Sequence, residues 1–375
     1  MLHAGDGLGR RSARGLTATT MVNSLIRRAI SILMAVGLAT AIAADTPPDA
    51  STVIVGTPAV LLTRSAPEYP RSEVIHQKEG WLLVSYDITA EGQVSDIVIL
   101  DQVGPKPFAD AAIKALKAWT FKPATFQREP AAQLNNLQSF VFRFSDGMFG
   151  IDYQRGREFK KLLELVNGKD DPAAQALIDR LLDLPLNIYE LTVLNVQRAT
   201  LARRAQQFDD EVAFQQRALM GSGILGDKMN ASLLGNLFIA QVRTGKVADA
   251  LATYQKMIPL ASALPNWSGF EAVHRDLVAA QTSNQPLSTR GAIRRVQWSE
   301  DFVWTHHLLR RSIEFSEVQG TLRRFQVRCE RKVVGDQVLA GKNWTVPAGW
   351  GQCTLYVYGD PGATFMVTEF ADVTQ

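Results

Sequence analysis

The chain has 375 residues, of which 46% are hydrophobic and 21% are charged. It is too long for one compact core and too apolar for a disordered chain, so two or three globular domains are expected. The 16 Pro and 27 Gly are ordinary numbers and no short motif repeats, which excludes collagen-like and low-complexity classes.

Residues 1–43 are expected to be a signal peptide. From Met21 onward, two arginines precede an apolar run, and small residues precede a cut after Ala43, which is the order of a secretory signal. Residues 1–20 contain no apolar run, so Met21 is the expected true start. The chain is then exported, and in a Gram-negative cell its location is the periplasm.

The alternative is an uncleaved inner-membrane anchor with the rest of the chain facing the periplasm. The apolar stretch over 29–44 is shorter than the ~20 residues that span a bilayer, which favours cleavage. After removal of the leader, 35 basic and 36 acidic residues remain, so the pI of about 8.8 comes largely from the leader. No basic surface typical of nucleic-acid binding is indicated.

Residues 44–66 contain three prolines and are expected to be a tether. The following domain, 67–148, has the pattern of an α-β-β-α-β unit. Alternating and helical apolar spacing predicts its elements in this order: a helix over 70–78, strands over 81–88 and 94–101, a helix over 107–119 and a strand over 137–144.

This unit resembles the C-terminal domain of TonB, the periplasmic transducer for outer-membrane uptake. The matching blocks are Pro67, Tyr69-Pro70, Glu79-Gly80, Glu91-Gly92-Gln93-Val94, Asp96-Ile97-Val98-Ile99, Phe108-Ala109-Asp110-Ala111-Ala112, Ala115-Leu116 and Trp119-Thr120-Phe121-Lys122-Pro123-Ala124. Each block also has a structural explanation, such as a turn at Gly92 or a core position at Trp119.

The resemblance implies a binding site made of backbone. A short extended peptide of an outer-membrane receptor, the TonB box, would pair with the open edge of the third strand by strand addition. The alternative is that a neighbouring domain or a second copy covers this edge. The implied partner-binding residues are Leu137, Gln138, Ser139, Phe140, Val141, Phe142, Arg143 and Phe144.

The chain also departs from this family. The tether is short, the apolar segment has no counterpart of the family's membrane-helix His, and more than two hundred residues follow the domain. Force transmission on its own is therefore not expected, and inner-membrane motor proteins are expected partners only if the leader remains as an anchor.

Residues 155–285 have a helical period without strand signals. A shift of 39 residues aligns 205–219 with 244–258, which indicates helical hairpin repeats. They weakly resemble the tetratricopeptide class through Gly245, Ala250 and Tyr254. An irregular helical bundle is the alternative.

Residues 291–375 return to short strands separated by Gly-rich turns, which predicts an antiparallel β-sandwich or barrel. The chain's two cysteines, Cys329 and Cys353, lie here. A metal site lacks the usual spacing, and export to an oxidising compartment favours a disulfide between them.

No catalytic motif, metal site or cofactor-binding motif is found. His306 and His307 would face opposite sides of a strand and are expected to be a surface or turn pair.

Together the three predicted modules give an α+β multidomain fold class. The expected function is non-enzymatic recognition of a peptide or protein in the periplasm by strand addition, related to TonB-dependent transport. The alternative is a periplasmic scaffold that binds envelope proteins through its helical repeats.

Overall fold

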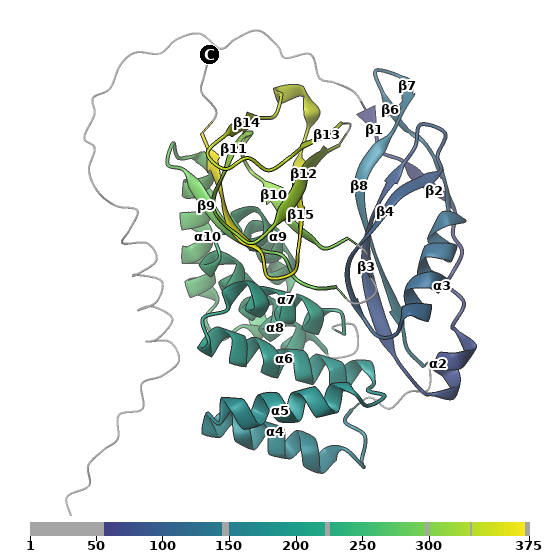
Figure 1. The fold of residues 1–375 in the computed structure, drawn as a ribbon, viewed down its shortest axis with the longest axis vertical. Coiled ribbons are helices and arrows are strands. Elements are labelled where there is room, and N and C mark those ends of the chain that lie inside the picture. Colours follow the sequence, from purple (N-terminus) through teal and green to yellow (C-terminus); the bar gives the residue numbers. More distant parts are fainter. Residues whose placement is uncertain are drawn as a thin grey trace, which may run out of the picture. The chain divides into compact units, whose positions relative to one another are not determined.

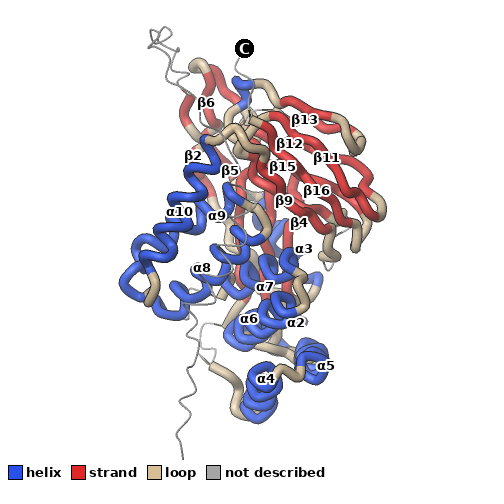
Figure 2. Tube along the Cα trace, turned by 90° about the vertical axis from the view of Figure 1, so that its left-hand side faces the viewer, coloured by secondary structure: helices blue, strands red, loops and turns tan. Residues whose placement is uncertain are grey.

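The computed structural model describes residues 56–144, 150–221, 226–296, 299, 301–330 and 332–371. The expected signal peptide and most of the expected tether lie outside this range. Among the described residues, no helix combines the length and apolar character needed to cross a membrane. Helices and antiparallel sheets occur together, which confirms the α+β class (Figures 1 and 2).

The first module is built on a three-stranded antiparallel sheet of order β4-β3-β8. One face of this sheet carries alternate apolar residues of β3, such as Leu82 and Val84, and of β8, such as Phe140. Helix α3 covers this face with Phe108 and Leu116, which are fully buried (Figure 1). The elements are α2 (Arg71–Ile75), β3 (Gly80–Ile88), β4 (Val94–Val103), α3 (Lys106–Lys117) and β8 (Gln133–Phe142).

Short strands extend this module beyond the predicted elements. Part of the expected tether is ordered, because β1 (Gly56–Thr57) pairs with β6 (Ala124–Phe126), and β2 (Val60–Thr63) pairs with β5 (Thr120–Lys122). The hairpin partner of β6 is β7 (Glu129–Ala131). The prediction of an unpatterned tether was therefore wrong for residues 56–63, whose backbone groups find partners in the segment after α3.

The second module consists of helical hairpins followed by one further helix. Its elements are α4 (Gly156–Gly168), α5 (Asp171–Leu182), α6 (Ile188–Arg204), α7 (Phe208–Leu219), α8 (Gly226–Arg243), α9 (Val247–Met257), the 3-10 helix η2 (Ile258–Ala263) and α10 (Trp267–Thr282).

The first helix of each of three hairpins ends in the same way. Lys169, Gln206 and Gly245 have positive φ angles of 61°, 60° and 75°. In each case the amide of this residue bonds a carbonyl three residues back, and the next amide bonds a carbonyl five residues back, which is the Schellman motif. The sequence repeat marked only the last two hairpins, whereas α4 and α5 form a third with the same turn.

The third module is a β-sandwich of two four-stranded antiparallel sheets, β10-β15-β12-β13 and β14-β11-β16-β9. Its core contains Trp304, Phe315, Phe325 and Phe365. The elements are β9 (Leu287–Ala292), β10 (Val303–Leu308), β11 (Ser312–Gln319), β12 (Leu322–Cys329), β13 (Val333–Asp336), β14 (Asn343–Thr345), the 3-10 helix η3 (Ala348–Trp350), β15 (Cys353–Gly359) and β16 (Thr364–Phe370).

Cys329 and Cys353 lie opposite each other on β12 and β15 and form the predicted disulfide. The domain begins earlier than the expected residue 291, because its first strand is β9, where Leu287, Thr289 and Gly291 face inward. Polar and small residues at these inward positions hid the pattern from the sequence.

We predict that Gly245→Ala destabilises the protein by about 1–3 kcal/mol. An alanine at position 245 would have to adopt an unfavourable positive φ, and its Cβ would lie 2.3 Å from the Ser288 carbonyl oxygen. Gln206→Gly, at the corresponding turn of the preceding hairpin, should raise stability by up to about 1 kcal/mol because glycine tolerates this φ. Urea unfolding of both variants measures the difference, and equal effects would contradict the argument.

Candidate functional site

The outer edge of β8 is the candidate binding site. Its inner edge pairs with β3 from Phe142 opposite Gly80 to Gln133 opposite Ile88. On the outer side, the Leu134 amide donates to the Glu330 carbonyl at 3.3 Å, so the sandwich occupies the beginning of the strand. For residues 137–142, no backbone hydrogen bond joins the outer edge to any other described segment.

The side chains along this edge alternate between exposed and buried positions. Leu137 and Val141 are 50% and 42% exposed, whereas Phe140 and Phe142 are buried under α3. Leu137 through Phe142 thus lie in β8 as predicted. Arg143 and Phe144 were predicted to continue the strand but follow its end.

Phe144, which follows β8, is held in place by residues that precede β3. Its ring stacks on Tyr69 at a centroid distance of 5.0 Å, and its amide donates to Glu79 Oε1 at 2.8 Å. This position ties the end of β8 to the start of β3 and leaves the six residues 137–142 as the accessible edge.

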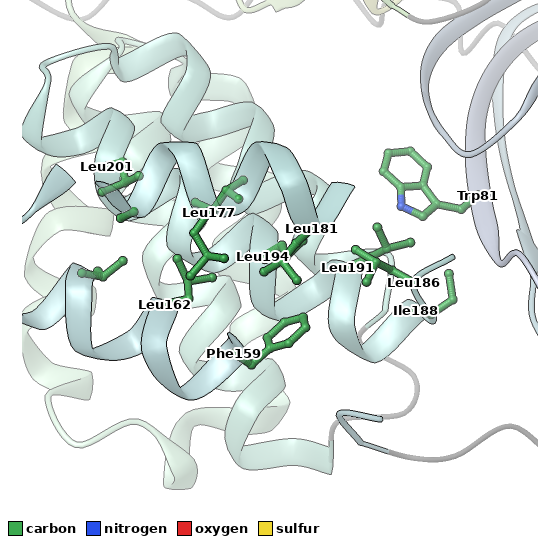
Figure 3. Packing of buried hydrophobic residues seen from close by; sticks show 13 residues of the cluster. Trp81, Phe159, Leu162, Leu177, Leu181, Leu186, Ile188, Leu191, Leu194 and Leu201 are labelled. Atoms are coloured by element: carbon green, nitrogen blue, oxygen red, sulfur yellow. The ribbon is translucent and has the colours of Figure 1, made fainter. Parts of the chain in front are cut away.

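The face of this sheet opposite α3 is closed by the other two modules. Trp81 of β3 belongs to the same buried cluster as Leu186, Ile188 and Leu191 of the helical module, and Figure 3 shows its indole projecting toward them. Further along the same face, Leu100 of β4 packs against the buried tyrosines of the sandwich.

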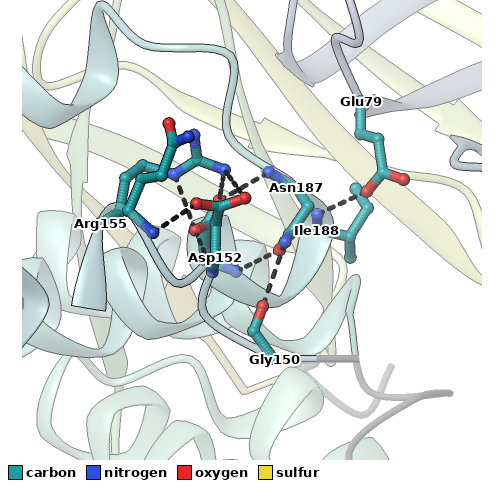
Figure 4. A network of polar contacts seen from close by, with 8 residues as sticks. Glu79, Gly150, Asp152, Arg155, Asn187 and Ile188 are labelled. Atoms are coloured by element: carbon teal, nitrogen blue, oxygen red, sulfur yellow. Dashed lines mark hydrogen bonds and ion pairs between the residues drawn. The ribbon is translucent and has the colours of Figure 1, made fainter. Parts of the chain in front are cut away.

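Glu79 connects the sheet to the N-terminus of α6. Its Oε2 accepts the Ile188 amide at 2.7 Å (Figure 4). Its Oε1 accepts the Phe144 amide. A carboxylate is stabilised there because the first amides of a helix are unpaired and carry partial positive charge. Beside it, Asn187 and Glu190 form a capping box, and Glu190 also pairs with Arg155 at 2.8 Å.

A buried carboxylate connects the sheet to the sandwich. Asp87 Oδ2 accepts a hydrogen bond from Arg328, and its Oδ1 accepts the Asn135 amide at 2.9 Å. Burial works to lower the pKa of Arg328, but the hydrogen bond and charge of Asp87 outweigh this and raise it. The Tyr356 hydroxyl donates to Ser85 and lies close to Asn135, and burial raises its pKa to about 12.

A second ion pair connects the sheet to the helical module. Arg217 of α7 donates to both oxygens of Asp101 on β4, at 2.8 and 2.7 Å. Bidentate pairing of this kind fixes the orientation of the guanidinium plane relative to the carboxylate plane. With α3 on one face and two modules on the other, the described part of this sheet offers a backbone partner only its strand edges, of which the outer edge of β8 is one.

The two neighbouring histidines do face opposite ways, but they lie in strand β10 and not in a turn. His306 is buried and bonds Glu369 at 2.9 Å within the sandwich. His307 points to α9 and bonds Asp249 at 2.6 Å. The prediction of a surface pair was therefore wrong for His306, whose inward position completes the sandwich interior.

Charged residues also surround a cavity of about 180 Å³ between the modules, which sequence analysis did not anticipate. These residues are Asp101, Asp209, Lys246, Asp249, Arg294 and His307. They are far apart in the chain and carry no local motif. Among the described residues, no group of three His, Cys, Asp or Glu could hold a metal ion.

Comparisons with known proteins give matches to the first module. The family profile described as Gram-negative bacterial TonB protein C-terminal matches residues 65–144. A solution NMR structure of the Pseudomonas aeruginosa TonB C-terminal domain is similar at 24% identity, over 24% of this chain and 90% of that chain, with a TM-score of 0.21. No curated protein matches the chain.

Residues 65–144 are therefore a domain of the TonB C-terminal family, within a chain whose other two modules lie outside that match. The match covers 80 of the 375 residues, and the family is related to transport across the Gram-negative cell envelope.

We predict that Arg328→Met lowers the free energy of unfolding by about 3–5 kcal/mol, because it leaves the Asp87 carboxylate buried without its cation. The control is Lys106→Met, which breaks the exposed Lys106–Asp110 pair and should cost at most about 1 kcal/mol. Chemical denaturation measures both values. Similar losses in the two variants would show that the buried pair is not a major contributor.

We further predict that His307 contributes stability that decreases with rising pH. Its hydrogen bond to Asp249 raises the pKa of His307 above the ordinary 6.5. Burial alone would lower this pKa, but the hydrogen bond outweighs it. For Asp249, burial works to raise the pKa, but the His307 bond and nearby positive charges lower it to about 2, so Asp249 stays ionised. The contribution is thus complete below pH 6.5 and is lost as the pH rises through the raised value.

The measurement is the difference in melting temperature between the wild type and His307→Gln from pH 5.5 to pH 9. This difference should be largest at the acidic end. The matched control is His76→Gln, directly after α2, where the exposed imidazole bonds the nearby Ser72 carbonyl. A difference that stays constant or grows with pH would contradict the assignment.

Proposed function

We propose that this chain is a non-enzymatic periplasmic protein that recognises an extended peptide by strand addition to β8, in connection with TonB-dependent transport. The observation that carries this proposal is the edge formed by residues 137–142, which has no backbone partner among the described segments. An added strand gains main-chain hydrogen bonds there with little demand on its side chains.

The limited length of the open edge favours specific pairing with a short segment over unspecific pairing. An open, apolar edge invites unspecific pairing, and proteins usually shorten or cover such edges. Here the sandwich occupies the beginning of β8 at Leu134, and Phe144 is fixed at its end. The remaining length suits a short segment such as a TonB box, the outer-membrane receptor peptide that this family binds.

The test uses two proline variants, Gln138→Pro and Ser139→Pro. Adjacent residues of a strand direct their amides to opposite sides, so one proline removes an outward donor and the other removes a bond to β3. The variant that keeps its melting temperature has lost only the outer donor. We expect this variant to bind TonB-box peptides of the organism's own receptors at least about tenfold more weakly than the wild type.

Isothermal titration with the wild type and both variants measures this effect. Ile75→Ala, which truncates an exposed side chain of α2 outside the β8 edge, is the control and should retain the affinity. Unchanged binding to the stable proline variant would contradict strand addition.

A second candidate function is an envelope scaffold. The packing of Trp81 into the helical cluster and the Asp87–Arg328 pair favour it, because they make the first module a fixed part of a larger unit. In this case the partner would bind the helical hairpins. Partner capture would then survive the edge-blocking proline, so the same experiment separates the two functions.

A further inference from the structure

The cavity of about 180 Å³ between the modules has the features of a ligand site. Its walls come from β3, β4 and β8 of the first module, from α7 and α9 of the helical module, and from β10 and β15 of the sandwich. Its walls include apolar side chains such as Leu83, Leu100 and Val303 as well as the six charged ones. Concave sites with a few polar groups among apolar walls are typical of small-molecule binding.

Four of the charged side chains have partners in the protein. Asp101 pairs with Arg217, and Asp249 pairs with His307. Lys246 donates to the Thr305 carbonyl at 3.3 Å, and its Nζ lies 4.6 Å from the Trp304 ring centroid. These contacts account for their charges within the fold.

Arg294 and Asp209 are different. Among the described residues neither forms a hydrogen bond or an ion pair, and they do not pair with each other. Asp209 Oδ1 is fully buried. Burial and the charge of Arg217 lower the pKa of Arg294, while burial raises the pKa of Asp209. Unpaired charges in such surroundings are costly, so a missing partner is indicated.

A ligand with one negative and one positive group would pair both side chains at once. A guanidinium matches the two oxygens of a carboxylate, and a carboxylate accepts from an ammonium group. The volume is below the ~300–1,000 Å³ of sites for drug-sized molecules, so the ligand must be small. We propose that this cavity binds a free amino acid, with its carboxylate on Arg294 and its amino group on Asp209.

This cavity adjoins a larger cleft that could serve as its entry route. A larger cleft of about 880 Å³ shares Asn135, Asp249, His307 and Thr354 with the cavity wall. The His307 side chain is half exposed at this boundary. An amino acid would pass beside the His307–Asp249 pair before it reaches Arg294.

The test is thermal shift and isothermal titration on the full chain with the twenty standard amino acids at millimolar concentration. At least one should raise the melting temperature and bind. Analogues of that amino acid that lack the amino group or the carboxylate should bind at least about tenfold more weakly. If no amino acid binds, or if an analogue binds equally well, the proposal is overturned.

Two variants assign the contacts. Arg294→Gln should abolish binding while the unliganded protein keeps or raises its melting temperature, because an unpaired charge is removed. Asp209→Asn should remove the preference for the amino acid over its analogue without an amino group. The control is Arg295→Gln, since Arg295 is exposed next to Arg294 and lies over the Phe302 ring.

Equal amino-acid binding by the Arg294→Gln and Arg295→Gln variants would overturn the assignment. If Arg294→Gln fails to fold, Arg294→Lys replaces it, since it keeps the charge but loses the forked geometry and should weaken binding. Peptide binding at β8 should be unchanged in Arg294→Gln, so failure of one proposal is distinguishable from failure of the other.

Discussion

The carboxylate of Asp87 is the contact on which the arrangement of the modules depends. One oxygen fixes Asn135, whose φ of 60° bends the start of β8, and the other pairs with Arg328 of the sandwich. Both charged side chains are buried, so neither can be satisfied by water if the other is absent. A single side chain thus shapes the candidate binding strand and holds the third module against it.

Docking of this kind changes what the first module can offer a partner. An isolated three-stranded sheet with one helix has an open face as well as open edges. Here Trp81, Glu79 and Asp101 attach that face to the helical module, and Asp87 attaches it to the sandwich. Recognition through the sheet is thereby restricted to an edge, where affinity comes from backbone groups.

Local patterns predicted most elements but few of the contacts between them. Alternation at Leu82, Val84 and Tyr86 located β3, and the spacing of Phe108 and Leu116 located α3, since both depend on neighbours in sequence. Asp87 and Arg328 are 241 residues apart, and nothing near either residue marks the other. The same holds for Arg294 and Asp209, because a cavity formed by three modules is a property of the tertiary structure.

The closed face of the sheet also bears on how such a chain can evolve. Trp81, Leu83 and Leu100 are apolar and are covered only by segments that lie far downstream. A recombination event that moved residues 65–144 into another gene would bring along this uncovered surface and the stranded charge of Asp87. Residues 65–144 therefore depend on the two hundred residues that follow them for the burial of their apolar face, and the two parts are expected to be inherited together.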